Sequence, residues 1–290
     1  MDSLILHNNR IIPLSEVRLS PGQAGLLAGW GVFTTLRVYR GQPFEFHRHW
    51  ERMARDAARL GLEMIWSESD VASQIVELAG ANRRPEGMAR VWFVRNQGGL
   101  WADNVPRPAT DLLVFTRELA PWPAVHRLLL VPHAIYSVGV LAGAKMLSWA
   151  QNTLLAERAR AEGCDDALLL NERDELAECT SANVFLVRDG RALTPPLSSG
   201  CLPGVTREVL LEIAPEAGIE IEERTLRPED LERADEVFIS STTREVAGVG
   251  FVGSGRGDPL KWAAPGKVTE ALEAAFQRYV HKKLGPPAAG

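Results

Sequence analysis

The sequence predicts an α/β protein of two domains with a large share of antiparallel sheet. Short runs of alternating or β-branched residues meet at two-residue turns that are typical of hairpins. Amphipathic helical patterns lie among these runs. The segment Ala120-Pro121-Trp122-Pro123 interrupts both kinds of pattern, because proline fits neither a helix interior nor a central strand. We therefore expect a smaller N-terminal domain over residues 1–119, a linker over 120–123 and a larger C-terminal domain over 124–290.

The first half contains two hairpin patterns and two helical patterns. The first hairpin turns at Asn8-Asn9 and the second at Arg40-Gly41. The first helix has apolar residues three and four positions apart and ends at Gly61. The expected elements are hairpins over 4–14 and 32–46, helices over 47–62 and 67–79, and strands over 88–95 and 111–118 that flank a glycine-rich loop.

The second half repeats this mixture of strands and helices. A helix from about residue 149 to 162 stops at Gly163, and a hairpin turns at Asp189-Gly190. The run 235–241 is expected to be the last strand. The other expected elements are strands over 127–136, 167–171 and 175–180, the hairpin over 183–195, and helices over 204–218 and from about 267 onward.

Composition excludes several classes of function. The net charge is −5 and no long basic block occurs, so the electrostatic signature of nucleic-acid binding is missing. Three cysteines without CxxC spacing favour neither disulfides nor a zinc site, and they suit a reducing cytoplasm. No apolar run is long enough for a membrane helix, and the N-terminus does not resemble a signal peptide. We expect a cytoplasmic protein with a small-molecule partner and no metal.

One lysine is unusually isolated. Of 32 basic residues only five are lysines, and Lys145 is the only one in the first 260 residues. Arginine serves ion pairs at least as well as lysine, so a retained lysine suggests chemistry that requires an amine. Chance retention of a single lysine is the alternative.

Three later segments contain polar groups that could form a site. Glu178 lies on an expected strand before small polar residues, although an edge-strand glutamate in solvent would look the same. Gly204-Val205-Thr206 begins a helix, where free N–H groups favour a phosphate, unless Thr206 is only an N-cap. Ser241-Thr242-Thr243 places hydroxyls after a strand, as an ordinary ST-turn also would.

Taken together, these segments resemble the class IV aminotransferases, the pyridoxal-phosphate (PLP) enzymes of fold type IV. That family includes branched-chain aminotransferases, D-amino-acid aminotransferases and aminodeoxychorismate lyase. The resemblance extends over nearly the whole chain and is densest in KMLSWAQNTLLAERARAEGCDDALLLNERDELAECTSANVFLV, LTPPLSSGCLPGVTREVL and LRPEDLERADEVFISSTT. It implies a site in the cleft between two domains, completed by a loop from the neighbouring subunit of a homodimer.

The resemblance also implies roles for individual residues. Lys145 would bind PLP covalently and move a proton between the substrate Cα and the cofactor. Glu178 would pair with the pyridine nitrogen and keep it protonated. Arg52, which matches the arginine of the family's HxxR helix, would bind the cofactor phosphate. Val205, Thr206 and Thr242 would complete the phosphate site.

The residues that select the substrate match no subfamily throughout. Branched-chain enzymes usually have a tyrosine five positions after the lysine, where this chain has Ala150. The run Phe33-Thr34-Thr35 resembles aminodeoxychorismate lyases, whereas the turn Ser240-Ser241-Thr242-Thr243 resembles D-amino-acid aminotransferases. The substrate-site candidates are Phe33, Arg95, Trp149 and Thr243, with Trp30, Asn96 and Trp101 nearby.

The expected function is ping-pong transamination between an amino acid, such as a branched-chain or other apolar one, and a 2-keto acid. The first alternative is a lyase that uses the same cofactor to release pyruvate from aminodeoxychorismate. Others are a D-amino-acid aminotransferase and a relative that has kept the fold and lost catalysis; the presence of Lys145 and Glu178 argues against the last.

Overall fold

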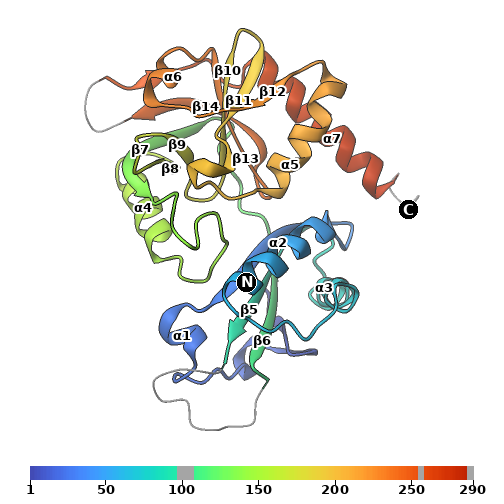
Figure 1. Cartoon of the computed structure of the whole chain (residues 1–290). Helices are drawn as coiled ribbons and strands as arrows, with labels where there is room; N and C mark the ends of the chain where they lie inside the picture. Colours follow the sequence, from blue (N-terminus) through green and yellow to red (C-terminus); the bar gives the residue numbers. More distant parts are fainter. Residues whose placement is uncertain (97–107, 254–257, 286–290) are drawn as a thin grey trace. The chain divides into compact units, whose positions relative to one another are not determined.

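The computed structural model describes residues 1–96, 108–253 and 258–285 (Figure 1). The chain divides into two compact units. The first comprises Met1–Ala120 and Ala144–Trp149, and the second comprises Pro121–Gly143 and Ala150–Gly290. The chain therefore passes from one unit to the other three times, whereas the sequence predicts a single passage through a linker.

The described residues of the first unit form an antiparallel sheet of six strands in the order β2-β1-β6-β5-β3-β4. Asn8 and Asn9 both have positive φ, as the turn of the predicted first hairpin requires. Arg40 and Gly41 do the same in the second hairpin. The strands are β1 (Leu4–His7), β2 (Arg10–Pro13), β3 (Gly31–Tyr39), β4 (Gln42–Pro43), β5 (Gly87–Arg95) and β6 (Thr110–Arg117).

Helices α2 (Phe46–Arg59) and α3 (Glu68–Ala81) cover one face of this sheet (Figure 1). Side chains alternate along β3, so Val32 and Leu36 pack against the helices in a fully buried core with Met53 of α2. Phe33 lies on the opposite face. A short helix α1 (Ala24–Ala28) and a 3-10 turn, η1 (Leu14–Glu16), complete the unit.

The sheet face that carries Phe33 is also apolar. Four side chains form a second buried cluster there, and five more partly cover it. The buried members are Ile5, Val94, Leu113 and Phe115, and the covering residues include Leu19, Trp92 and Leu147.

The described residues of the second unit form a mixed sheet of nine strands. The order is β12-β11-β10-β13-β14-β7-β8-β9, and β15 pairs with β14. The pairs β7–β8, β7–β14 and β11–β12 are parallel, and the others are antiparallel. The predicted α/β class with mixed and antiparallel sheets is confirmed. The strands are β7 (His126–Ile135), β8 (Asp166–Asn171), β9 (Leu176–Cys179), β10 (Asn183–Arg188), β11 (Arg191–Thr194), β12 (Ile221–Glu223), β13 (Glu236–Ser241), β14 (Glu245–Gly253) and β15 (Leu260–Lys261).

Helices accompany this sheet. α4 (Ala150–Ala161) packs on β8, and α7 (Lys267–Leu284) packs on β14 and α5 (Val205–Ile213). The remaining elements are α6 (Pro228–Glu232) and the 3-10 turns η2 (Leu197–Ser199) and η3 (Ala214–Ala217). The core includes Leu128, Leu168, Val237 and Val249, each fully or almost fully buried.

The expectation that residues 235–241 are the last strand is wrong, because β14 follows directly as β13's antiparallel neighbour. Its sequence, EVAGVGFVG, contains three glycines, which lower the intrinsic strand propensity. Pairing with β7 and β13 on its two sides stabilises it nevertheless.

The segment 144–149 packs on β3, although its position in the sequence predicts that it belongs to the second domain. The Phe33 N–H donates to the Lys145 carbonyl (3.0 Å), and the Leu147 N–H donates to the Gly31 carbonyl (2.9 Å). Gly31 permits this close approach, since a Cβ there would lie 2.5 Å from Leu147 Cδ1. The backbone that contains Lys145 is thus held by the first unit.

Among the described residues, no helix is both long and apolar enough to cross a membrane. Within the same ranges, no group of three or more His, Cys, Asp or Glu side chains is arranged to hold a metal ion. The three cysteines are free and buried.

Candidate active site

Lys145 lies against two aromatic rings in the first unit. Its Nζ is 4.7 Å from the ring centroid of Phe33 and 4.6 Å from that of Trp149. The two rings meet edge to face with centroids 5.2 Å apart. An ammonium group is attracted by ring faces at such distances, and the rings also limit its contact with water. The Lys145 side chain is therefore held between apolar surfaces.

The Lys145 backbone is fixed by a buried carboxylate. Its N–H donates to Oδ2 of Asp56 (3.0 Å), a residue of α2 whose side chain is almost completely buried. Burial raises the pKa of Asp56, although the Lys145 N–H and the guanidinium groups of Arg55 and Arg52 act in the opposite direction. Asp56 is not among the residues predicted from the sequence. The available signal was a charged residue on the buried side of an amphipathic helix.

Arg52 is one turn before Asp56 on the same helix, and it is also buried. Its Nη2 donates to the Thr34 hydroxyl on β3 (2.8 Å), and that hydroxyl is 2.7 Å from His49 Nδ1. Burial holds the pKa of His49 well below its usual value, and the positive charges of Arg52 and Lys145 add to this effect. His49 is therefore neutral, and its Nδ1 can accept a hydrogen bond from the Thr34 hydroxyl. Thr34 and His49 together position the Arg52 guanidinium.

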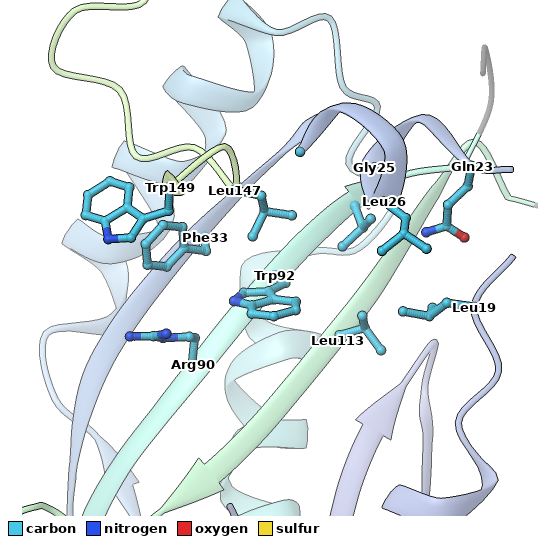
Figure 2. Close-up of a pocket in the computed structure, with 12 residues that line it drawn as sticks. Leu19, Gln23, Gly25, Leu26, Phe33, Arg90, Trp92, Leu113, Leu147 and Trp149 are labelled. Atoms are coloured by element: carbon cyan, nitrogen blue, oxygen red, sulfur yellow. The ribbon is translucent and has the colours of Figure 1, made fainter. Parts of the chain in front are cut away.

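A cavity of about 290 Å³ opens on the sheet face opposite α2 and α3 (Figure 2). Phe33 and Trp149, which flank Lys145, also line this cavity. Arg90 is at the same end, where its Nε donates to the Thr35 hydroxyl (3.0 Å) and its guanidinium carbon is 5.2 Å from the Phe33 ring centroid. Burial lowers the pKa of Arg90, and Arg117 lowers it further. The other lining residues are Leu19, Gln23, Gly25, Leu26, Gly29, Trp92, Val94, Leu113 and Leu147.

Arg95, the arginine predicted from the sequence, does not line the cavity. It is five positions after Arg90 on β5, so strand alternation directs the two side chains to opposite faces. The Arg95 guanidinium lies 4.4 Å from the Trp30 ring centroid. Trp30 is also absent from the cavity lining, and its indole N–H donates to the Leu60 carbonyl (2.9 Å). Trp101 falls outside the described residues, and Asn96 bonds to the Pro108 carbonyl (3.1 Å).

In the second unit, Glu178 of β9 faces the loop that leads to α5. Its Oε2 accepts the Leu202 N–H (3.0 Å), and the Asn183 amide donates to the Leu202 carbonyl (2.8 Å). The same loop ends at Gly204, where a Cβ would lie 2.0 Å from Asn183 Oδ1. Glycine is therefore required for the loop to pack this closely against β10.

Helix α5 begins at Val205 without a side-chain cap. Val205 and Thr206 are buried, and their N–H groups belong to the first turn, which has no preceding helical carbonyls to bond. Together with the helix dipole, such groups form a favourable site for a phosphate. Thr206 is the second residue of the helix, so the interpretation of Thr206 as the N-cap is wrong; Gly204 occupies that position.

Thr242 and Thr243 lie in the turn between β13 and β14 and are half-buried. Arg244 stabilises this turn through its backbone and its side chain. Its backbone N–H donates to the Ser241 hydroxyl (3.2 Å), and its side chain pairs with Asp166 (3.0 Å) and donates to the Ser181 hydroxyl (2.9 Å). Arg244 is not among the residues predicted from the sequence either. The feature that could have indicated it is a cation directly after a run of four hydroxyl residues.

The predicted site residues thus form two groups. Lys145, Arg52, Phe33 and Trp149 gather in the first unit. Glu178 and the start of α5 are linked through the 202–204 loop in the second unit, which also contains Thr242 and Thr243.

Comparisons with known proteins give the family. Residues 31–250 match the model for amino-transferase class IV. The chain belongs to the class IV aminotransferase family. This aminotransferase is 30% identical over 275 residues to a putative branched-chain-amino-acid aminotransferase of Methanocaldococcus jannaschii, covering 93% of this chain and 94% of the relative. It is 28% identical over 289 residues to a D-alanine aminotransferase of Bacillus licheniformis, covering 95% and 96%.

Solved structures of similar fold include branched-chain aminotransferases, and one of them contains a form of the cofactor. The branched-chain aminotransferase of Thermoproteus uzoniensis, solved with norvaline, has a TM-score of 0.88 and 25% identity, covering 98% of this chain and 96% of that chain. Another branched-chain amino acid aminotransferase, solved with pyridoxamine 5'-phosphate, has a TM-score of 0.87 and 25% identity, covering 99% and 96%.

The predicted class IV membership, fold type IV architecture, transaminase activity and PLP cofactor are confirmed. The residues of this chain fit such a cofactor. They include an amine against aromatic rings and a buried helix N-terminus without a side-chain cap.

Proposed function

We propose that this aminotransferase moves the amino group of an amino acid with an apolar side chain to a 2-keto acid. The observation that supports this substrate class is the cavity lined by Phe33, Trp149 and mainly apolar side chains beside the Lys145 amine. Such a lining favours an apolar side chain, because burying it removes apolar surface from water.

We assign cofactor binding to Arg52, Lys145, Glu178, Val205, Thr206 and Thr242, following the class IV resemblance. Arg52 and the first-turn N–H groups of Val205 and Thr206 bind the phosphate, and the hydroxyl of Thr242 donates to it. Glu178 accepts a hydrogen bond from the pyridine N–H and so keeps that nitrogen protonated. Bound PLP supplies an electron sink for the negative charge that develops at the substrate Cα.

Lys145 is the proposed catalytic residue. Its amine would hold the cofactor covalently in the resting enzyme and, when free, would act as the base that takes the proton from the substrate Cα. Phe33 and Trp149 orient the amine and keep water from it. Lys145 and Arg52 both lower the pKa of His49, so the catalytic amine and the proposed phosphate ligand lie near the same imidazole.

A carboxylate of the amino or keto acid is proposed to bind Arg90. Thr243 is proposed as a substrate residue on the class IV resemblance alone. Arg90 lies at the Lys145 end of the cavity and has no carboxylate partner among the described residues. A half-buried guanidinium in apolar surroundings favours a bound anion. Arg90 therefore suits this role better than Arg95, which stacks on Trp30.

We further propose that the enzyme is a cytoplasmic homodimer. Three buried free thiols suit a reducing compartment. Tyr136, Val138 and Val140 are 67%, 64% and 90% exposed in the single chain. Apolar side chains that are exposed together in this way favour contact with a second protein surface. Sedimentation of the purified protein tests the dimer directly.

The proposed reaction is tested on the purified enzyme with panels of L- and D-amino acids. We expect the visible absorption band of bound PLP to bleach with apolar amino acids of one enantiomeric series, either L or D. The band should return when a 2-keto acid is added. Borohydride reduction followed by peptide mapping should place the cofactor on Lys145. Bleaching by neither panel, together with pyruvate release from aminodeoxychorismate, would instead establish the lyase.

A further inference from the structure

We propose that the cavity beside Lys145 binds a long or aromatic side chain that ends in a neutral hydrogen-bond acceptor, and that Gln23 selects this acceptor. The inference rests on the proposed function, since it assumes that the cavity receives the substrate side chain. It narrows the substrate class from apolar amino acids in general to those with an oxygen at the far end of the side chain.

The polar side chains of the cavity are almost entirely hydrogen-bond donors. The side-chain nitrogen atoms of the lining belong to Gln23, Arg90, Trp92 and Trp149, and only Gln23 also has an acceptor oxygen. That oxygen is already engaged, because Gln23 Oε1 accepts the Ser20 N–H (3.2 Å). A ligand that fills the cavity must therefore bring acceptors.

The N–H donors of the Gln23 amide lie among apolar side chains of the cavity. The bond from the Ser20 N–H fixes the orientation of the amide, since a backbone N–H can bond only to the oxygen. Gln23 is 3% exposed, and its Nε2 has no hydrogen-bond partner among the described residues. A buried donor without an acceptor destabilises the folded chain unless a ligand supplies one.

The other end of the cavity has a different set of donors. Trp92 Nε1 is also buried without a partner among the described residues, and Figure 2 shows it on the side toward Arg90. The Trp92 indole N–H and the Arg90 guanidinium are both donors that can bind the carboxylate of the substrate. Gln23 lies at the opposite end, beyond Trp92 and Leu113 (Figure 2).

The spacing between the two ends sets the length of the side chain. Phe33, Trp92 and Leu113 lie opposite one another on three adjacent strands, so two interstrand spacings, about 10 Å in total, separate the first from the third. A para-substituted phenyl ring extends over much of this distance, whereas a valine side chain does not. Because Gln23 is uncharged and lies among Leu19, Leu26 and Leu113, a neutral acceptor is favoured there over a buried carboxylate.

The test compares two unreactive, achiral acids on the PLP-loaded enzyme. The acids 3-phenylpropionate and 3-(4-hydroxyphenyl)propionate differ only in the terminal hydroxyl, and their binding can be followed by tryptophan fluorescence. We expect the wild type to bind the hydroxylated acid at least about fivefold more tightly. Gln23→Met, of similar length without the amide, should abolish that preference and bind 3-phenylpropionate at least as well as the wild type.

Two further variants keep the test decisive. Gln23→Glu preserves the side-chain shape and removes both N–H donors, so it should also lose the preference even if the methionine variant folds poorly. Gln74→Met is the control, because Gln74 is a glutamine of the same unit that lies outside the cavity, and it should keep the wild-type ratio.

The outcome separates this inference from the proposed function. The same two compounds as 2-keto acids, phenylpyruvate and 4-hydroxyphenylpyruvate, measure transamination in parallel. An equal affinity for the two acids in the wild type, or an unchanged ratio in both Gln23 variants, would overturn the inference even if transamination is rapid. The expected binding ratios without turnover of any keto acid would contradict the proposed function and leave the cavity assignment standing.

Discussion

The Asp56 carboxylate accepts the backbone N–H of Lys145 at 3.0 Å, although 89 positions separate the two residues in the chain. The bond joins a helix that covers one face of the first sheet to the segment that contains the proposed catalytic amine. Arg52 is four positions before Asp56 on that helix, so a single α2 positions both the Lys145 backbone and the proposed phosphate ligand.

Asp56→Ala should lower kcat about tenfold with little change in KM. The buried backbone N–H of Lys145 would lose its hydrogen-bond acceptor. The side-chain amine of Lys145 would then be positioned less well for the reaction. Asp56→Asn keeps an acceptor oxygen and should retain most of the wild-type kcat. Steady-state kinetics at saturating substrate, with thermal melts of both variants, measure the difference. Equal kcat values for alanine and asparagine would show that this bond does not position the lysine.

Lys145→Ala should leave the fold intact and remove detectable transamination, because no other amine of the described residues lies against Phe33 and Trp149. Lys145→Arg is the matched control for charge, since guanidinium keeps the cation but cannot act as the base at ordinary pH. Both variants should therefore be inactive while retaining the wild-type circular dichroism. Normal turnover by either variant would remove Lys145 from the catalytic role.

Arg244→Met should weaken PLP retention more than it lowers thermal stability. The Arg244–Asp166 pair is almost fully buried, and buried pairs are weak evidence for stability but do fix geometry. Its loss should free the turn that contains Thr242. We expect the PLP dissociation constant, measured by dialysis and absorbance, to rise about tenfold. Asp166 would also be left without its partner, so Asp166→Asn/Arg244→Met is the matched control, and a normal PLP affinity in both would contradict the positioning role.

His126 should make stability depend on pH. Its side chain is fully buried, and neither ring nitrogen has a hydrogen-bond partner among the described residues. Burial lowers the pKa of His126 to about 4, with Arg244 acting in the same direction. The unfolded chain, with an ordinary histidine pKa of about 6.5, binds the proton more readily.

The stability contributed by neutral His126 is therefore complete above about pH 6.5 and is lost as the pH falls toward 4. His126→Phe removes this titration. Urea unfolding at pH 7.5 and pH 5 should show a smaller loss of stability for the variant than for the wild type. The same pH dependence in both proteins would show that other groups account for it.

Local sequence determined much of the fold and several parts of the site. Asn8-Asn9 and Arg40-Gly41 predicted their hairpins, because a tight turn needs residues that tolerate positive φ. Periodicity predicted α2 and α3 to within a few residues. The isolation of Lys145 and the class IV resemblance together gave the family and the cofactor.

Tertiary structure decided which of these residues meet. Position in the sequence assigns Lys145 to the second domain, but hydrogen bonds to Gly31, Phe33 and Asp56 hold its segment in the first unit. Alternation alone indicates that Arg90 and Arg95 point to opposite faces of β5. Only the packing of α2 and α3 on one face of the sheet left the other for the cavity, and so placed Arg90 rather than Arg95 beside Phe33. Such contacts depend on chain segments that are far apart in sequence, and no local pattern encodes them.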